Sequence, residues 1–182
     1  MPKGYLALVL HAHLPYVRHP EYEYFLEENW YFEALTETYL PLLDVFDRLT
    51  ADGVPFRITV GLTPPLLSMF GDRFLAERYL RHLDSLLELA DREVDRTRWE
   101  PWFRRLAEMY RGWLQRARHL FAEVYQGDPV QGFLRLQEAG RLELITSAAT
   151  HGYLPLLDYN PPAVQAQIRI GVAEHRRRLG RQ

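Results

Sequence analysis

Residues 5–16 read Tyr-Leu-Ala-Leu-Val-Leu-His-Ala-His-Leu-Pro-Tyr, and this stretch decides the fold class. Six apolar residues run without interruption into His11 and His13, and Pro15 ends the run. An apolar run of this length after Gly4 is typical of a strand covered on both faces, as parallel strands in α/β proteins are. We therefore expect a buried strand near the start of the chain, with two imidazoles where it ends.

The spacing of these histidines predicts that they share one face of the strand. Side chains alternate between the two faces, so His11 and His13 point to one side and Ala12 to the other. Ligands of parallel sheets and barrels bind where the strands end, so a His-Xaa-His there is a candidate site. The alternative is that both histidines are loop residues whose hydrogen bonds are satisfied within the protein.

The composition is that of a globular domain. Of the 182 residues, 47% are hydrophobic and 25% are charged. The net charge is −2, so the chain has no strong positive electrostatic field that would attract nucleic acid or an anionic membrane. Cysteine is absent, which excludes disulfides and thiolate metal sites. No signal-like or membrane-spanning stretch occurs, so we expect a cytoplasmic protein. The arginine-rich composition suits a protein that works at high temperature, and genomic base composition explains it equally well.

Aromatic residues crowd the segment that follows the first strand. They are Tyr16, Tyr22, Tyr24, Phe25, Trp30, Tyr31 and Phe32, interleaved with Glu21, Glu23, Glu27 and Glu28. Neither a strand nor a helix buries all of these rings at once, so we expect a loop that exposes some of them. Aromatic faces and carboxylates together form a groove that suits sugar rings and their hydroxyl groups. For any single ring, packing over the end of the sheet is the alternative.

Hydrophobic periodicity predicts that strands and helices alternate along the chain. The expected elements are a strand at 5–10, a helix at 31–50, a strand at 55–62, helices from 64 to about 126, a helix at 129–139, a strand at 141–147, and a helix from 161 to the stop at Gly180. This order predicts a parallel sheet with helical crossovers. Three strands cannot close a barrel, so the sheet is either small and open or the front part of a larger barrel, and we favour the barrel.

The helical stretch at about 64–126 is too long for a simple crossover, so we expect an inserted helical hairpin with a break near Trp99. Thr63, Asp72 and Asp128 are expected to be helix N-caps. The apolar stripe of the second hairpin helix is expected to pack between helices rather than to bind a ligand. This stripe consists of Trp102, Leu106, Tyr110 and Trp113.

A third histidine, His151, follows the third expected strand, so three imidazoles can meet at the carboxyl ends of the strands. One interpretation is the zinc or manganese centre of a metal-dependent hydrolase. Its metal ligands would be His11, His13 and His151, with Asp158 as a further one. A second is a sugar site, because neutral imidazoles both donate and accept hydrogen bonds. A third is a scaffold in which the histidines only pack. From the residues alone, the metal and sugar interpretations rank nearly equal.

Two motifs carry a resemblance to a known family. Residues 11–16, His-Ala-His-Leu-Pro-Tyr, resemble the first signature of glycoside hydrolase family 57, and residues 140–146, Gly-Arg-Leu-Glu-Leu-Ile-Thr, resemble the second. The continuation at 147–157 is similar to the 1,4-α-glucan branching enzymes of that family, more than to its amylases or 4-α-glucanotransferases. The similarity extends over essentially the whole chain.

The resemblance implies an α/β fold that is an incomplete (β/α)7 barrel, with no metal or other cofactor. It implies a retaining transfer of an α-1,4-glucan to a 6-hydroxyl group by a Glu nucleophile and an Asp acid/base, in a full-length enzyme that is monomeric. His11, His13 and His151 match family positions that hold the sugar where cleavage occurs, and we expect Tyr16 and Trp30 to contact it too. Glu143 matches the acidic residue of the second signature, where we expect an ion pair within the barrel.

The chain departs from the family pattern at the catalytic residues. The nucleophile of the family lies in a Trp-Leu-Pro-Glu-like motif on the fourth strand, and no residue here matches it or the acid/base. We therefore expect residues 1–182 to be the N-terminal part of the catalytic barrel, with its helical insert at about 64–126. We expect them to contact glucan but to have no branching activity alone.

Overall fold

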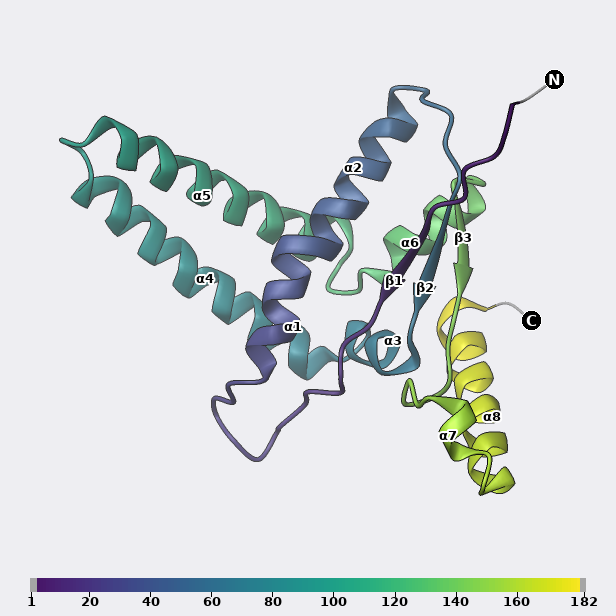
Figure 1. The fold of residues 1–182 in the computed structure, drawn as a ribbon. Coiled ribbons are helices and arrows are strands. Elements are labelled where there is room, and N and C mark those ends of the chain that lie inside the picture. Colours follow the sequence, from purple (N-terminus) through teal and green to yellow (C-terminus); the bar gives the residue numbers. More distant parts are fainter. Residues whose placement is uncertain (1–2, 181–182) are drawn as a thin grey trace.

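The computed structural model describes residues 3–180, and these contain a sheet of three parallel strands in the order β1-β2-β3. The strands are β1 (Val9–Ala12), β2 (Ile58–Leu62) and β3 (Leu142–Ile145). Their carboxyl ends lie at the same edge of the sheet (Figure 1). The predicted parallel sheet is therefore confirmed, and β2, not β1, is its central strand.

Helices cover only one face of this sheet. Ala12, Val60 and Leu144 are buried on the covered face, whereas Glu143 and Ile145 on the other face are exposed. Val9 of β1 is 62% exposed. The expectation of a strand covered on both faces is wrong for β1, because β1 is an edge strand and nothing among residues 3–180 covers its outer face.

The connection from β1 to β2 is helical, as predicted. It consists of α1 (Glu28–Ala34), the π-helical turn η1 (Leu35–Tyr39) and α2 (Leu40–Ala51). Pro41 has no N–H to donate to the preceding turn, which accounts for the local change from α- to π-helical hydrogen bonding. The helix ends where Gly53 adopts a left-handed backbone, with a φ of 71°.

A long helical hairpin lies between β2 and β3. It follows α3 (Pro64–Phe70) and consists of α4 (Arg73–Arg96), α5 (Pro101–His119) and the π-helical turn η2 (Leu120–Val124). Asp72 caps α4 as predicted, since its Oδ1 accepts a 3.0 Å hydrogen bond from the N–H of Leu75. The paired helices α4 and α5 extend well away from the sheet (Figure 1).

The predicted packing stripe of α5 is wrong for its outer three residues, whereas Trp113 is half-buried. Trp102, Leu106 and Tyr110 are exposed, whereas Leu114 and Ala117 are buried. The reason is the length of the hairpin: its base packs against the body of the protein, but its outer half forms a two-helix layer with no third element beside it in the described chain.

The last third of the chain returns to the sheet and then covers its end. Helix α6 (Val130–Glu138) leads into β3, and the long helix α8 (Pro161–Leu179) ends at Gly180, whose φ is 67°. Asp128 was expected to be the N-cap of α6. Its side chain does accept a hydrogen bond from the N–H of Val130, but the residue directly before the helix is Pro129. The short helix α7 (Leu154–Leu157) was not predicted.

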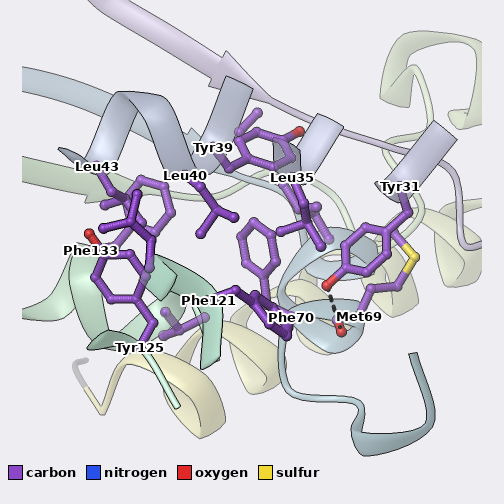
Figure 2. Close-up of a cluster of buried hydrophobic side chains, with 14 of the residues drawn as sticks. Tyr31, Leu35, Tyr39, Leu40, Leu43, Met69, Phe70, Phe121, Tyr125 and Phe133 are labelled. Atoms are coloured by element: carbon purple, nitrogen blue, oxygen red, sulfur yellow. Dashed lines mark hydrogen bonds between the residues drawn. The ribbon is translucent and has the colours of Figure 1, made fainter. Parts of the chain in front are cut away.

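The hydrophobic core joins the first crossover, α3, the base of the hairpin and α6. Figure 2 shows the aromatic rings at its centre, where the Tyr31 hydroxyl donates a 3.1 Å hydrogen bond to the carbonyl of Met69. The largest fully buried side chains include Tyr31, Tyr79, Tyr125, Phe70, Phe121 and Phe133. Within residues 3–180, no helix combines the length and apolarity that crossing a membrane requires.

Candidate functional site at the carboxyl end of the sheet

The three predicted histidines meet at the carboxyl end of the sheet. The ring centroids of His11 and His151 are 4.7 Å apart, those of His13 and His151 are 4.3 Å apart, and those of His11 and His13 are 6.2 Å apart. The Nε2 atoms of His11 and His151 lie 3.2 Å from each other. The predicted convergence of β1 and the segment after β3 is therefore confirmed.

Gly61 provides the space in which His11 lies. It is the register partner of His11 on the central strand, and a Cβ atom placed on it would lie 3.4 Å from Nδ1 of His11 and 3.7 Å from Ile145. Any larger side chain on β2 would fill the space between β1 and β3 at this level. The absence of a side chain at position 61 thus leaves room for the imidazoles.

Thr63 orients His13. Its hydroxyl forms a 3.0 Å hydrogen bond with Nδ1 of His13, and Thr63 is fully buried. The threonine does occupy the predicted N-cap position of α3, but its side chain makes no capping hydrogen bond. Pro64 and Pro65 supply no N–H groups in the first turn, so the hydroxyl is free to bind the imidazole instead. From its sequence Thr63 was expected only to cap α3 and not to contact the site, although its place directly after β2 is a usable signal.

Helix α8 holds the loop that carries His151. The Gln167 side chain accepts a 2.9 Å hydrogen bond from the N–H of Thr150 and donates one of 2.8 Å to its hydroxyl, and the carbonyl of Gln167 accepts from the N–H of Ala149. His151 itself has a φ of 57°, a left-handed conformation that costs about 1–2 kcal/mol in a residue other than glycine. These contacts offset that strain, and no local sequence pattern pointed to Gln167.

The electrostatics of the cluster favour a neutral His13. Partial burial lowers the pKa of His13, and the proximity of His151 and then His11 lowers it further. A neutral imidazole presents one N–H donor and one acceptor nitrogen. This arrangement suits ligands that carry hydroxyl groups, which both donate and accept hydrogen bonds.

The metal interpretation is not supported. In the described range 3–180, no three or more His, Asp or Glu side chains are arranged so that they could hold a metal ion. One nitrogen of His13 is already bonded to Thr63, and Asp158 is an exposed residue at the end of α7. The donor set proposed from the sequence is therefore not assembled.

The segment between β1 and α1 exposes some of its rings, as predicted, whereas Trp30, Tyr31 and Phe32 lie in α1 and the last two are buried. Tyr16 and Trp30 are about half exposed, and no hydrogen bond or ring contact joins either of them to the three histidines in the part of the chain that the structure describes. The structure thus brings together three of the five predicted sugar-contact residues and leaves the role of these two rings as a prediction.

A buried ion pair fixes this loop to the hairpin. Arg78 of α4 binds the carboxylate of Glu28 at 2.6 Å and donates to the carbonyl of Tyr22, while Glu28 accepts a 3.1 Å hydrogen bond from the N–H of His19. The guanidinium also lies over the ring of Phe74. Glu28 is 2% exposed, so it is not the groove carboxylate that the sequence suggested. Its pairing partner lies 50 positions away and was not foreseen.

Glu143 forms a hydrogen bond rather than the expected ion pair. Its Oε2 accepts a 2.8 Å bond from the hydroxyl of Thr59, its register partner on β2. Among residues 3–180, no cation pairs with it. The parallel register puts these two side chains next to each other on the open face, and this explains the difference.

The family follows from comparison with known proteins. The model of glycosyl hydrolase family 57 matches residues 7–182, nearly the entire chain. The chain belongs to glycosyl hydrolase family 57. This confirms the resemblance that the motifs at 11–16 and 140–146 indicated.

Several named proteins are similar to this chain in sequence and fold. The chain is 37% identical over 179 residues to the 1,4-alpha-glucan branching enzyme TK1436 of Thermococcus kodakarensis, which covers 98% of this chain and 26% of that protein. It is 45% identical to the solved alpha-amylase AmyC of Thermotoga maritima, with a TM-score of 0.92 over 97% of this chain and 33% of that one. It is 33% identical to the solved GH57-type branching enzyme of Pyrococcus horikoshii, with a TM-score of 0.91 over 100% of this chain and 33% of that one.

The chain spans about a quarter of the Thermococcus kodakarensis enzyme and about a third of these two solved structures. Its three parallel strands, helical crossovers and hairpin match their fold, so the expected α/β architecture from a (β/α)7 barrel is confirmed.

Proposed function

We propose that this family 57 chain binds a glucose unit of an α-1,4-glucan at His11, His13 and His151, as part of a 1,4-α-glucan branching enzyme. The observation that carries the proposal is the convergence of three imidazoles from two separated strand ends, with ring centroids 4.3–6.2 Å apart. Family membership and the branching-enzyme relative support the substrate class.

The chemistry of the rim fits a sugar hydroxyl. His13 is kept neutral by its lowered pKa and oriented by Thr63, so its other nitrogen is available to a ligand. His11 and His151 are exposed at the same place and add further donors and acceptors. Because Thr63 and Gln167 fix the positions of these rings in advance, little rotamer entropy is lost on binding.

The reaction itself belongs to groups that this sequence does not match. A retaining transfer needs a carboxylate nucleophile and an acid/base, and the sequence contains no Trp-Leu-Pro-Glu-like motif. We propose that residues 1–182 bind and orient the glucan and have no branching activity alone. Cytoplasmic location and a monomeric full-length enzyme stay predictions.

Calorimetric titration of the chain with maltoheptaose tests the binding proposal. We expect saturable binding that is lost in His13→Ala and absent with cellohexaose, whose β-linkages present the hydroxyls differently. Binding that His13→Ala leaves unchanged would contradict the proposed site.

A second candidate activity is α-amylase action, because AmyC is 45% identical to this chain. Incubation of amylose with a protein that includes this chain and the two catalytic carboxylates distinguishes amylase activity from branching activity. A branching enzyme creates α-1,6 linkages, seen by their anomeric proton signal, without raising the number of reducing ends. An amylase raises the number of reducing ends and creates no α-1,6 linkages.

A further inference from the structure

Two tryptophans at the tip of the hairpin are almost fully exposed: Trp99 in the turn between α4 and α5, and Trp102 in the first turn of α5. Trp99 is 81% exposed and Trp102 is 82% exposed. Tryptophan is the side chain that loses the most by facing water, so two of them close together at the hairpin tip point to a ligand. The core does not need these rings, because they lie at the far end of the hairpin from the sheet (Figure 1).

The turn and the start of α5 hold the two indoles on a hydrogen-bonded backbone. The N–H of Thr97 bonds to the carbonyl of Glu93, the N–H of Glu100 bonds to the carbonyl of Thr97 at 2.8 Å, and the N–H of Arg104 bonds to the carbonyl of Glu100. Thr97 is also buried, and its hydroxyl donates to the carbonyl of Glu93. The rings are therefore presented by an ordered turn, which reduces the entropy lost on binding.

Polar groups of both kinds surround the rings. The guanidinium of Arg98 lies 5.3 Å from the Trp99 ring, and that of Arg105 lies 5.7 Å from the Trp102 ring. A hollow of about 400 Å³ opens beside Trp99, lined by Arg92, Asp95, Arg96, Arg98 and Trp99. The tip thus combines flat aromatic faces with hydrogen-bond donors and a carboxylate acceptor.

We propose that the hairpin tip is a second glucan-binding surface, at which Trp99 and Trp102 stack on sugar rings of the same α-1,4-glucan that the histidine rim holds. This inference rests on the proposed function for the substrate class. A sugar ring offers an apolar face to an indole and a rim of hydroxyls to arginine and aspartate. Three arginines and one aspartate line the hollow, so an anionic lipid surface is the competing ligand, and the vesicle measurement below separates it from glucan. Insertion of the tip into a bilayer would bury the charged side chains beside the rings.

The distance of the tip from the sheet makes the surface selective for long chains. Helix α4 has 24 residues, which corresponds to a length of about 36 Å. A short oligosaccharide can occupy the tip or the rim, whereas a long glucan can occupy both and gain avidity from the second contact.

Native gel electrophoresis of the chain in the presence of dissolved glycogen or amylose tests this inference. We expect Trp99→Ala/Trp102→Ala to weaken the apparent affinity for glycogen by roughly tenfold or more, within the gain that linking two sites provides. Calorimetric binding of maltotriose at the rim is expected to stay unchanged. Trp99→Phe/Trp102→Phe is expected to restore most of the retardation, because the stacking face remains.

The matched control is Tyr5→Ala, which also removes an exposed aromatic ring. Tyr5 is 95% exposed and precedes β1, away from both proposed surfaces. It is expected to behave as the wild type. Unchanged glycogen retardation in the Trp99→Ala/Trp102→Ala variant overturns the inference, and so does loss of binding to phosphatidylglycerol vesicles with unchanged glycogen binding. A chain that binds maltoheptaose through His13 but shows no effect at the tip leaves the proposed function intact. A wild-type chain that no glucan retards overturns both.

Discussion

The Nε2 atoms of His11 and His151 lie 3.2 Å apart, although 140 positions of sequence separate the two residues. Two features of the fold produce this approach. Gly61 leaves the central strand without a side chain at the level of His11, and α8 holds the loop after β3 so that His151 lies beside that space. The site is thus formed by the carboxyl ends of the strands together with α8, which holds the loop that follows β3.

Thr63 is expected to set the orientation of His13. Thr63→Val keeps the shape of the side chain but removes the hydroxyl, so the imidazole loses its 3.0 Å partner. A hydrogen bond of this kind contributes about 0.5–1.5 kcal/mol, and we expect a loss of stability in that range together with weaker maltoheptaose binding. Chemical denaturation and calorimetry measure the two effects.

The control for this variant is Thr38→Val, at an exposed position of η1. It makes the same chemical change and is expected to leave sugar affinity unaltered. If Thr63→Val binds maltoheptaose as the wild type does, the proposed role of Thr63 is wrong.

Gln167 is expected to position His151 through its loop. Gln167→Leu removes both side-chain hydrogen bonds to Thr150 while the backbone bond to Ala149 can persist. We expect His151 to leave its strained left-handed conformation, because only backbone hydrogen bonds and the contact with His11 then oppose the strain. Sugar affinity should fall while the melting temperature changes little.

Gln165→Leu on the exposed side of the same helix is the matched control. The chemical shift of the His151 ring reports the movement directly. A His151 signal that is the same in Gln167→Leu and in wild type would show that the loop does not depend on this clamp.

The ion pair between Arg78 and Glu28 is expected to be essential to the aromatic loop. Arg78→Met leaves a buried carboxylate without its partner, and breaking such a pair costs about 3–5 kcal/mol. The second change Glu28→Gln removes the orphaned charge, so the double variant should recover part of this stability. The free energy of unfolding in urea measures both steps.

Glu93→Gln breaks an exposed ion pair, that with Arg96, and serves as the control. It should unfold at the urea concentration of the wild type, because solvent screens such pairs. Equal losses of unfolding free energy in Arg78→Met and Glu93→Gln would mean that burial does not strengthen the ion pair between Arg78 and Glu28.

Stability is expected to fall as the pH drops below about 6.5. Burial lowers the pKa of His13, His82 and His175 in the folded chain, so the unfolded chain takes up protons at a higher pH than the folded one. The histidine contribution is complete above pH ~6.5 and is lost as the pH falls toward the lowered values. Urea unfolding between pH 7.5 and 5.5 measures the slope.

His13→Gln and His82→Gln should each reduce this slope, since each removes one of the three groups. A free energy of unfolding that rises as the pH drops through this range would contradict the direction of all three pKa shifts.

Most elements could be predicted from the sequence because they depend on local patterns. Periodicity located the long helices, Asp72 and Gly180 marked a helix start and a helix end, and the apolar runs located β2 and β3. The site histidines were predictable for the same reason: in a parallel sheet, residues that follow the strands meet at one edge.

The errors came from contacts between distant segments. The exposure of β1 and of the α5 stripe depends on which layers lie beside them, and an apolar pattern is the same with or without a neighbour. The pairing of Glu28 with Arg78 and the bonds from Gln167 to Thr150 join residues far apart in sequence, so no local spacing reveals them. Thr63 was assigned to capping because a threonine before a helix usually caps it.

The most direct test of the sugar site is an NMR titration of the chain, labelled with ¹⁵N in its histidine rings, with maltoheptaose. The account predicts that the ring signals of His11, His13 and His151 shift together and saturate at one concentration. The signal of His119, which pairs with Glu123 on the hairpin, should not move. Ring signals of the three clustered histidines that stay fixed while maltoheptaose binds would contradict the account.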